Sequence, residues 1–174
     1  VPTDQGPQVQ RNPGAPGCVW FVNEIRWVNS PDEEIAALND FNPVRTAVID
    51  KAWQADLPSW QQLASSDSAA TIRLTDYPAP DRLLYESQSA SPRLAVFSEV
   101  FYKPWHAYID GREVKPIRVD YILRGLEIPA GTHKIEFRCV DDVYLRSARI
   151  SLIASIVVGV VFLALLGMAV RNAV

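Results

Sequence analysis

The stretch FYKPWHAYIDG, residues 101–111, decides the fold that the sequence predicts, because it joins a run of aromatic residues to a tight turn. Asp110-Gly111 favours a two-residue hairpin turn, since the central positions of such a turn need positive φ angles. We therefore expect residues 106–109 and 112–114 to form a β-hairpin.

Short alternating runs of apolar and polar residues lie on both sides of this hairpin, and each reads as a β-strand. They occur at residues 71–75, 82–87, 93–102, 118–128 and 133–139. Several short strands at this spacing are typical of an antiparallel β-sandwich or jelly roll. Within it, we expect residues 118–128 to pair with residues 133–139 across a turn at residues 129–132.

The sequence divides into four segments. Residues 1–17 are rich in Pro, Gly, Gln and Asn and read as an extended linker. Residues 18–68 are expected to hold short strands and one helix that pack on the β-domain, and residues 69–145 to form the sandwich. Residues 148–171 are expected to form one transmembrane helix. The predicted fold class is mainly β, with a short N-terminal α/β segment before the sandwich.

The N-terminal segment contains a clear helix signal at about residues 31–39. Ser30 can accept hydrogen bonds from free backbone N–H groups, and Pro31 suits the first helical position. Glu33 completes a capping box. Short strands are expected on either side of this helix, at residues 18–28 and 46–49.

The C-terminal segment reads as a membrane anchor. Residues 150–170 carry no charge, and at about 1.5 Å per residue such a helix spans a hydrocarbon core of roughly 30 Å. A buried core helix is the alternative, but such helices rarely run apolar on every face for this length. Arg146 and Arg149 precede the run and Arg171 follows it. These charges alone would place the domain inside the cell.

Composition argues against several classes of function. The net charge of −3 is mildly acidic and argues against a nucleic-acid partner, whose phosphates call for a basic face. Motifs for zinc hydrolysis, phosphate loops, dinucleotides and serine nucleophiles are absent, so we expect no metal, no cofactor and no catalytic residue in this chain. Cys18 and Cys139 could pair in an oxidising compartment or remain two free thiols, and both alternatives stay open.

Three aromatic residues in and beside the opening stretch are candidates for binding a sugar. Tyr102, Trp105 and Tyr108 could stack on sugar rings, or they could fill the sandwich core. The period of two in a strand places Tyr108 on the same face as His106, opposite Ala107 and Ile109. His106 is expected to be a surface or hydrogen-bonded histidine, not a base.

Glu99 is expected to form an ion pair, because the alternation places it on the same strand face as apolar neighbours. A buried carboxylate needs hydrogen bonds or a cationic partner. Arg118 and Arg124 lie on one face of a later strand, and we predict pairing with Arg124 in preference to Arg118. Such a pair could fix the strand register, or Glu99 could instead be an acid that faces a substrate.

The ordered series FSEVFYKPWHAYIDG, RVDYILRGLEIPAGTHKIEF and then an apolar helix resembles the C-terminal end of YfhO-like bacterial membrane proteins. The upstream stretch NPGAPGCVWFVNEIRWVNSPDEEIAALNDFNPVRTAVID is similar to the segment that precedes this region in the family. The resemblance thus runs from about Gln8 to the last helix. One departure is Lys103-Pro104 before Trp105, where relatives more often have Gly.

The resemblance implies a glycosyltransferase architecture of the GT-C type, with many membrane helices. The chain would be the C-terminal extracytoplasmic domain and last helix of a longer protein, on the outer side of the bacterial cytoplasmic membrane. That protein would move a sugar from a polyprenyl-phosphate carrier to a cell-envelope polymer. Its catalytic acid would lie upstream, so no residue of this chain takes that role.

The implied partners are the upstream membrane helices of the parent protein, the lipid bilayer, a lipid-linked sugar and an envelope glycan. The alternative is a tail-anchored carbohydrate-binding or scaffold module without transferase activity.

Overall fold

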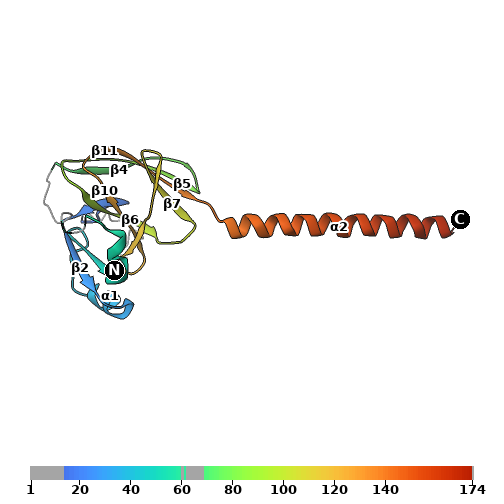
Figure 1. The fold of residues 1–174 in the computed structure, drawn as a ribbon, viewed down its shortest axis with the longest axis horizontal. Coiled ribbons are helices and arrows are strands. Elements are labelled where there is room, and N and C mark those ends of the chain that lie inside the picture. Colours follow the sequence, from blue (N-terminus) through green and yellow to red (C-terminus); the bar gives the residue numbers. More distant parts are fainter. Residues whose placement is uncertain (1–13, 60, 62–68, 174) are drawn as a thin grey trace, which may run out of the picture. The chain divides into compact units, whose positions relative to one another are not determined.

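A computed structural model describes residues 14–59, 61 and 69–173 (Figure 1). Most of the predicted linker at residues 1–17 lies outside the described residues. Two compact units make up the chain, one ending at Arg138 and the other beginning at Cys139. The first unit is mainly β with antiparallel sheets, and the second is an apolar helix, so the predicted fold class is confirmed.

Two antiparallel sheets form the sandwich. The first has four strands in the order β1 (Val19–Val22), β6 (Arg93–Val100), β10 (Leu123–Ile128) and β9 (Ile117–Val119). The second has five in the order β4 (Thr71–Ala79), β5 (Arg82–Ser89), β11 (Gly131–Cys139), β7 (Trp105–Ile109) and β8 (Arg112–Val114). Because β1 pairs with β6, the N-terminal segment contributes a strand to the sandwich itself.

The core lies between these sheets because each contributes one apolar face to it. Phe97 of the first sheet and Tyr85 and Phe137 of the second meet edge to face, with ring centroids 4.9–6.1 Å apart. Ala107 and Ile109 are buried in the same cluster, whereas His106 and Tyr108 are partly exposed on the other face of β7. The alternation predicted for this strand is therefore confirmed.

The Asp-Gly hairpin is also confirmed. β7 pairs with β8, and Asp110 and Gly111 have φ angles of 50° and 80°. Asp110 further ties this turn to β11, since its Oδ1 accepts from the Lys134 N–H at 2.9 Å and its Oδ2 lies 2.7 Å from His133 Nδ1.

The predicted pairing of residues 118–128 with residues 133–139 is wrong. The first run contains two strands, β9 and β10, separated by a turn in which Asp120 and Tyr121 have positive φ. β10 pairs with β6 and β9, while β11 crosses to the other sheet and pairs with β5. The alternation of apolar and polar residues predicts which side chains of a strand face the core, but it does not predict which strand lies beside it. β10 and β11 both fit the alternation, although they face the core from opposite sheets.

A small α/β element precedes the second sheet and packs on the sandwich. β2 (Glu24–Val28) and β3 (Thr46–Asp50) pair in parallel, and α1 (Pro31–Ala37) connects them. The Ser30 hydroxyl accepts from the Glu33 N–H at 3.2 Å, which is the predicted cap. After β3 the chain continues into the 3₁₀ helix η1 (Lys51–Asp56), whose first turn is capped by Asp50.

Asp120 joins this α/β element to the sandwich. Its backbone N–H donates to the Val48 carbonyl and its Oδ1 accepts from the Val48 N–H, both at 2.8 Å. Glu34 of α1 is fully buried beside it, where it accepts from the Tyr121 N–H at 2.9 Å and from Arg118 at 2.8 Å. Burial raises the pKa of Asp120 to about 6, and the nearby Glu34 carboxylate adds to that rise.

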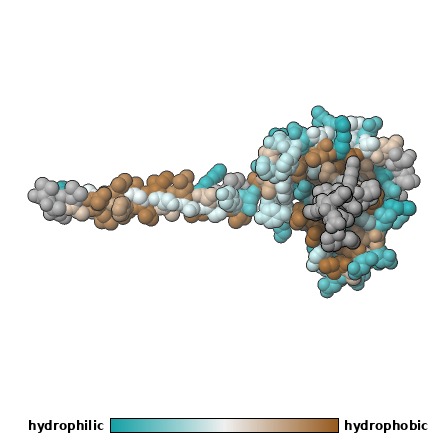
Figure 2. All heavy atoms as spheres, turned by 180° about the vertical axis from the view of Figure 1, so that it is seen from behind, coloured by the Kyte–Doolittle hydropathy of each residue, from teal (hydrophilic) through white to brown (hydrophobic). Residues whose placement is uncertain are grey.

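The second unit is the helix α2 (Asp142–Ala173). Its segment Arg146–Ala169 is long and apolar enough to cross a membrane, and apolar side chains run along it (Figure 2). At 1.5 Å per residue this segment is about 36 Å long, which exceeds the thickness of a hydrocarbon core. This supports the predicted membrane anchor.

Replacing Asp120 with Asn should change how stability depends on pH. The pKa of Asp120 in the folded protein, about 6, lies above the ordinary aspartate value of 3.8. Between these two pH values the folded protein therefore keeps a proton that the unfolded chain has released. This carboxyl therefore makes the free energy of unfolding fall as pH rises from about 4 to about 6. Denaturant titrations in micelles measure the free energy of unfolding of wild type and variant. The difference between the two should change by about 3 kcal/mol over that pH range. A difference independent of pH would contradict the assignment.

Candidate functional site

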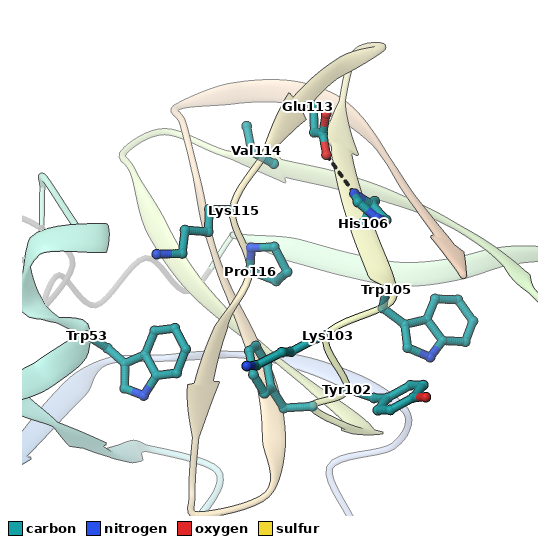
Figure 3. Close-up of a pocket in the computed structure, with 10 residues that line it drawn as sticks. Trp53, Tyr102, Lys103, Trp105, His106, Glu113, Val114, Lys115 and Pro116 are labelled. Carbon is teal, nitrogen blue, oxygen red and sulfur yellow. Dashed lines mark hydrogen bonds and ion pairs between the residues drawn. The ribbon is translucent and has the colours of Figure 1, made fainter. Parts of the chain in front are cut away.

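A cleft of about 660 Å³ opens beside the β7–β8 hairpin, and we call it the aromatic cleft (Figure 3). Its volume falls within the range of roughly 300–1,000 Å³ that is usual for ligand sites. Its walls come from η1, from the connection between β6 and β7, and from the hairpin with the residues after it. The lining residues are Trp53, Phe101, Tyr102, Lys103, Trp105, His106, Glu113, Val114, Lys115 and Pro116.

Aromatic rings occupy two sides of the cleft. Trp53 lies on one side, where the Phe101 ring meets it edge to face at a centroid distance of 5.2 Å. Tyr102 and Trp105 lie on the other side, and a hydrogen bond of 3.0 Å from the Trp105 N–H to the Tyr102 carbonyl closes the turn between them. Figure 3 shows the Tyr102 and Trp105 rings directed away from Trp53, so the two sides of the cleft offer separate aromatic surfaces on which a ligand could stack.

Charged side chains lie between and above these rings. Lys115 donates to both carboxylate oxygens of Asp56 at 2.7 and 2.8 Å, and its Nζ is 5.7 Å from the centre of the Trp53 ring. His106 Nδ1 lies 2.7 Å from Glu113 Oε1 on the neighbouring strand. Lys103 forms no ion pair with another residue of the described ranges, so its charge is available to an anionic ligand.

Arg124 supports Trp105 from the core side. This arginine is only 1% exposed, and its guanidinium carbon lies 4.4 Å from the centre of the Trp105 ring and 4.8 Å from that of Phe137. Arg124 also donates to Glu99 at 3.2 Å, so the ion pair expected from the sequence forms. The expected burial of Glu99 is wrong, however, because its side chain is 45% exposed and the buried partner is Arg124. Arg118 instead pairs with Glu34.

The three aromatic candidates have different positions. Trp105 packs against the core cluster, as one of the two alternatives had it, and it also lines the cleft. Tyr102 is 53% exposed and lines the cleft as well. Tyr108 does not line it, and its ring instead lies 4.6 Å below the Arg138 guanidinium. The structure therefore brings Tyr102 and Trp105 together and leaves Tyr108 apart.

Trp53, Lys103 and Lys115 also contribute to the cleft and were not among the sequence candidates. Trp53 sits in η1, where no alternation marks a buried or an exposed face. Asp50 was one local signal for this helix, because Asp is a common residue at a helix N-cap. Its side chain accepts from the Ala52 N–H at 2.8 Å and caps the helix that carries Trp53. The contact with Phe101 depends on the tertiary fold.

The remaining candidate chemistry is limited. In residues 14–59, 61 and 69–173, no group of three His, Cys, Asp or Glu side chains could hold a metal ion. Cys18 is an exposed free thiol, so it is not joined to Cys139. What the aromatic cleft offers is stacking surface, a cation and hydrogen-bonding groups, which suits the binding of a polar, partly flat ligand.

Comparison with known proteins finds no matching family model, no matching curated protein and no matching solved structure.

Replacing Glu99 with Gln should lower the free energy of unfolding by about 1–2 kcal/mol, because the buried Arg124 guanidinium then loses an ionic partner. The matched control is Glu86→Gln, which removes an exposed pair with Arg73 at 3.1 Å. We expect the control to cost less than about 1 kcal/mol. Denaturant titration of the chain in micelles measures the free energy of unfolding of both variants. If Glu99→Gln is as stable as the control, the Glu99–Arg124 pair does not stabilise the fold.

Proposed function

We propose that this chain is the C-terminal extracytoplasmic domain and last membrane helix of a YfhO-like glycosyltransferase, and that its aromatic cleft holds the acceptor glycan. The observation that carries the binding role is the cleft itself, whose lining includes Trp53 on one side, Tyr102 and Trp105 on the other, and Lys103. Sugar rings have an apolar face that stacks on such rings and hydroxyl groups that hydrogen-bond at the edges.

The charge in the cleft indicates which glycans it prefers. Lys115 already pairs with Asp56, so its charge is largely balanced, and His106 Nδ1 already lies 2.7 Å from Glu113 Oε1. Lys103 is the cation left for a ligand among the lining residues. A glycan that carries phosphate or carboxylate groups would therefore gain an additional contact over a neutral one.

The membrane helix supports the location in the proposal. β11 ends at Cys139 and α2 begins at Asp142, so only a short connection separates the β-domain from a segment able to cross a bilayer. The helix would thus tether the β-domain to the membrane that also holds the lipid-linked sugar donor. The upstream helices of the parent protein would supply the catalytic acid and the donor site.

The alternative is a tail-anchored carbohydrate-binding module without transferase activity. It uses the same cleft and differs only in what precedes residue 1. The reading frame upstream distinguishes the two. Many apolar segments favour the transferase, and a start codon or signal peptide close to residue 1 favours the module.

Replacing Tyr102 with Ala should weaken glycan binding about tenfold, because it removes one exposed stacking face. Tyr77→Ala is the matched control, since Tyr77 is similarly exposed at 56% but lies on β4 outside the cleft. Calorimetry on the chain in nanodiscs would use two envelope oligosaccharides of equal length, one neutral and one bearing phosphate. Lys103→Gln should reduce the affinity for the phosphate-bearing glycan alone.

Two results would contradict the proposal. One is that neither oligosaccharide binds to the folded chain. The other is that Tyr77→Ala weakens binding as much as Tyr102→Ala does, which would mean that the ligand contacts another surface.

A further inference from the structure

A second cleft, independent of the aromatic cleft, lies between α1 and the turn that joins β9 to β10. We call it the α1 groove, and its volume is about 420 Å³. Nearly all of its surface is apolar. Its lining residues are Trp20, Ile35, Leu38, Phe41, Pro43, Asp120, Tyr121, Ile122 and Leu123.

One charged side chain lines this apolar groove. Asp120 is 5% exposed, and its Oδ1 accepts from the Val48 N–H. Its other carboxylate oxygen, Oδ2, is buried and has no hydrogen-bond partner among the described residues. A buried carboxylate oxygen without a donor is costly, and such groups in native proteins usually meet a ligand, an ion or a water.

The charges around Asp120 leave an excess of one negative charge. Glu34 is fully buried and pairs with Arg118, with 2.8 Å between the Glu34 Oε2 and Arg118 Nη2 atoms. These two charges cancel each other, so the ionised Asp120 carboxylate stays unbalanced. The shape of the groove thus favours an apolar ligand, and its charge favours one cation.

The carboxylate is also held in place before any ligand arrives. Asp120 and Tyr121 both adopt positive φ angles, 49° and 69°, which are uncommon for residues other than Gly. Two hydrogen bonds to Val48 fix Asp120, and a bond from the Tyr121 N–H to Glu34 fixes its neighbour. Strained backbone of this kind clusters at ligand sites, and a fixed carboxylate loses little entropy on binding.

We propose that the α1 groove binds a small apolar molecule with one protonated amine. The ammonium group donates to Asp120 Oδ2, and the apolar body packs against Trp20, Leu38 and Phe41. A neutral alcohol supplies a donor without the charge, and a carboxylate would be repelled. This inference does not depend on the proposed function, because the α1 groove shares no lining residue with the aromatic cleft.

Three probes with the same ring and similar length test the proposal: 2-phenylethylamine, 2-phenylethanol and 3-phenylpropionate. Each is titrated into the chain in nanodiscs at neutral pH, with empty nanodiscs as the blank for membrane partitioning. The readout is the NMR signal of the Trp20 indole N–H, which donates to the Pro43 carbonyl at 2.7 Å. Both residues line the groove, and Trp20→Phe assigns the signal.

We expect the amine to shift the Trp20 signal and to bind about tenfold more tightly than the alcohol, with the carboxylate weakest. Asp120→Asn should bring the amine and alcohol affinities to within about twofold of each other. The control Asp76→Asn removes an exposed acid on β4, outside the groove, and should leave the preference for the amine unchanged.

A second variant keeps the test decisive if Asp120→Asn does not fold. Ile122 is 51% exposed at the groove, so Ile122→Ser removes apolar contact with little risk to the core. It should weaken all three probes and retain the preference for the amine. Equal binding of the three probes to wild type, or amine binding that leaves the Trp20 signal unmoved, would overturn the proposal.

Discussion

The buried guanidinium of Arg124 is the interaction on which the arrangement of the β-domain depends. Arg124 belongs to β10 in one sheet, whereas the rings of Trp105 and Phe137 that lie over it belong to β7 and β11 in the other. Glu99 on β6 supplies the countercharge. A buried cation is costly without such partners. The two sheets therefore pack most stably in the arrangement that brings both rings and Glu99 to Arg124. Trp105 is thereby held at the edge of the core, where it lines the aromatic cleft.

The two clefts have opposite chemistry on one scaffold. In the aromatic cleft, aromatic rings from two sides lie beside Lys103, which forms no ion pair with another residue that the structure describes. In the α1 groove, apolar side chains surround a fixed carboxylate with an excess negative charge. Both are built from loops and short helices at the margin of a rigid sandwich, which is where binding residues generally concentrate. The helix α2, which is long and apolar enough to cross a membrane, follows this domain in the chain.

Local patterns predicted much of this architecture. Alternation located most strands, Asp110-Gly111 located the hairpin, and an acid within an apolar strand correctly implied Arg124 as its partner. The pairing of residues 118–128 with residues 133–139 failed because alternation gives a face but not a neighbour, and two residues in the left-handed region divide the first run. The contact of Trp53 with Phe101 and the lining of the α1 groove arise from tertiary packing of distant segments, which local patterns do not predict. The proposed relation to YfhO-like proteins rests on the sequence resemblance, and the proposed glycan role rests on the cleft.

The most direct test of the central claim uses the indole N–H signals of the tryptophans as reporters on the chain in nanodiscs. Trp53 and Trp105 line the aromatic cleft, whereas Trp20 and Trp27 lie elsewhere. If the cleft holds an envelope glycan, titration with a phosphate-bearing oligosaccharide should move the Trp53 and Trp105 signals and leave those of Trp20 and Trp27 in place. Saturating glycan that moves neither cleft signal, or that moves only Trp20 and Trp27, would contradict the account.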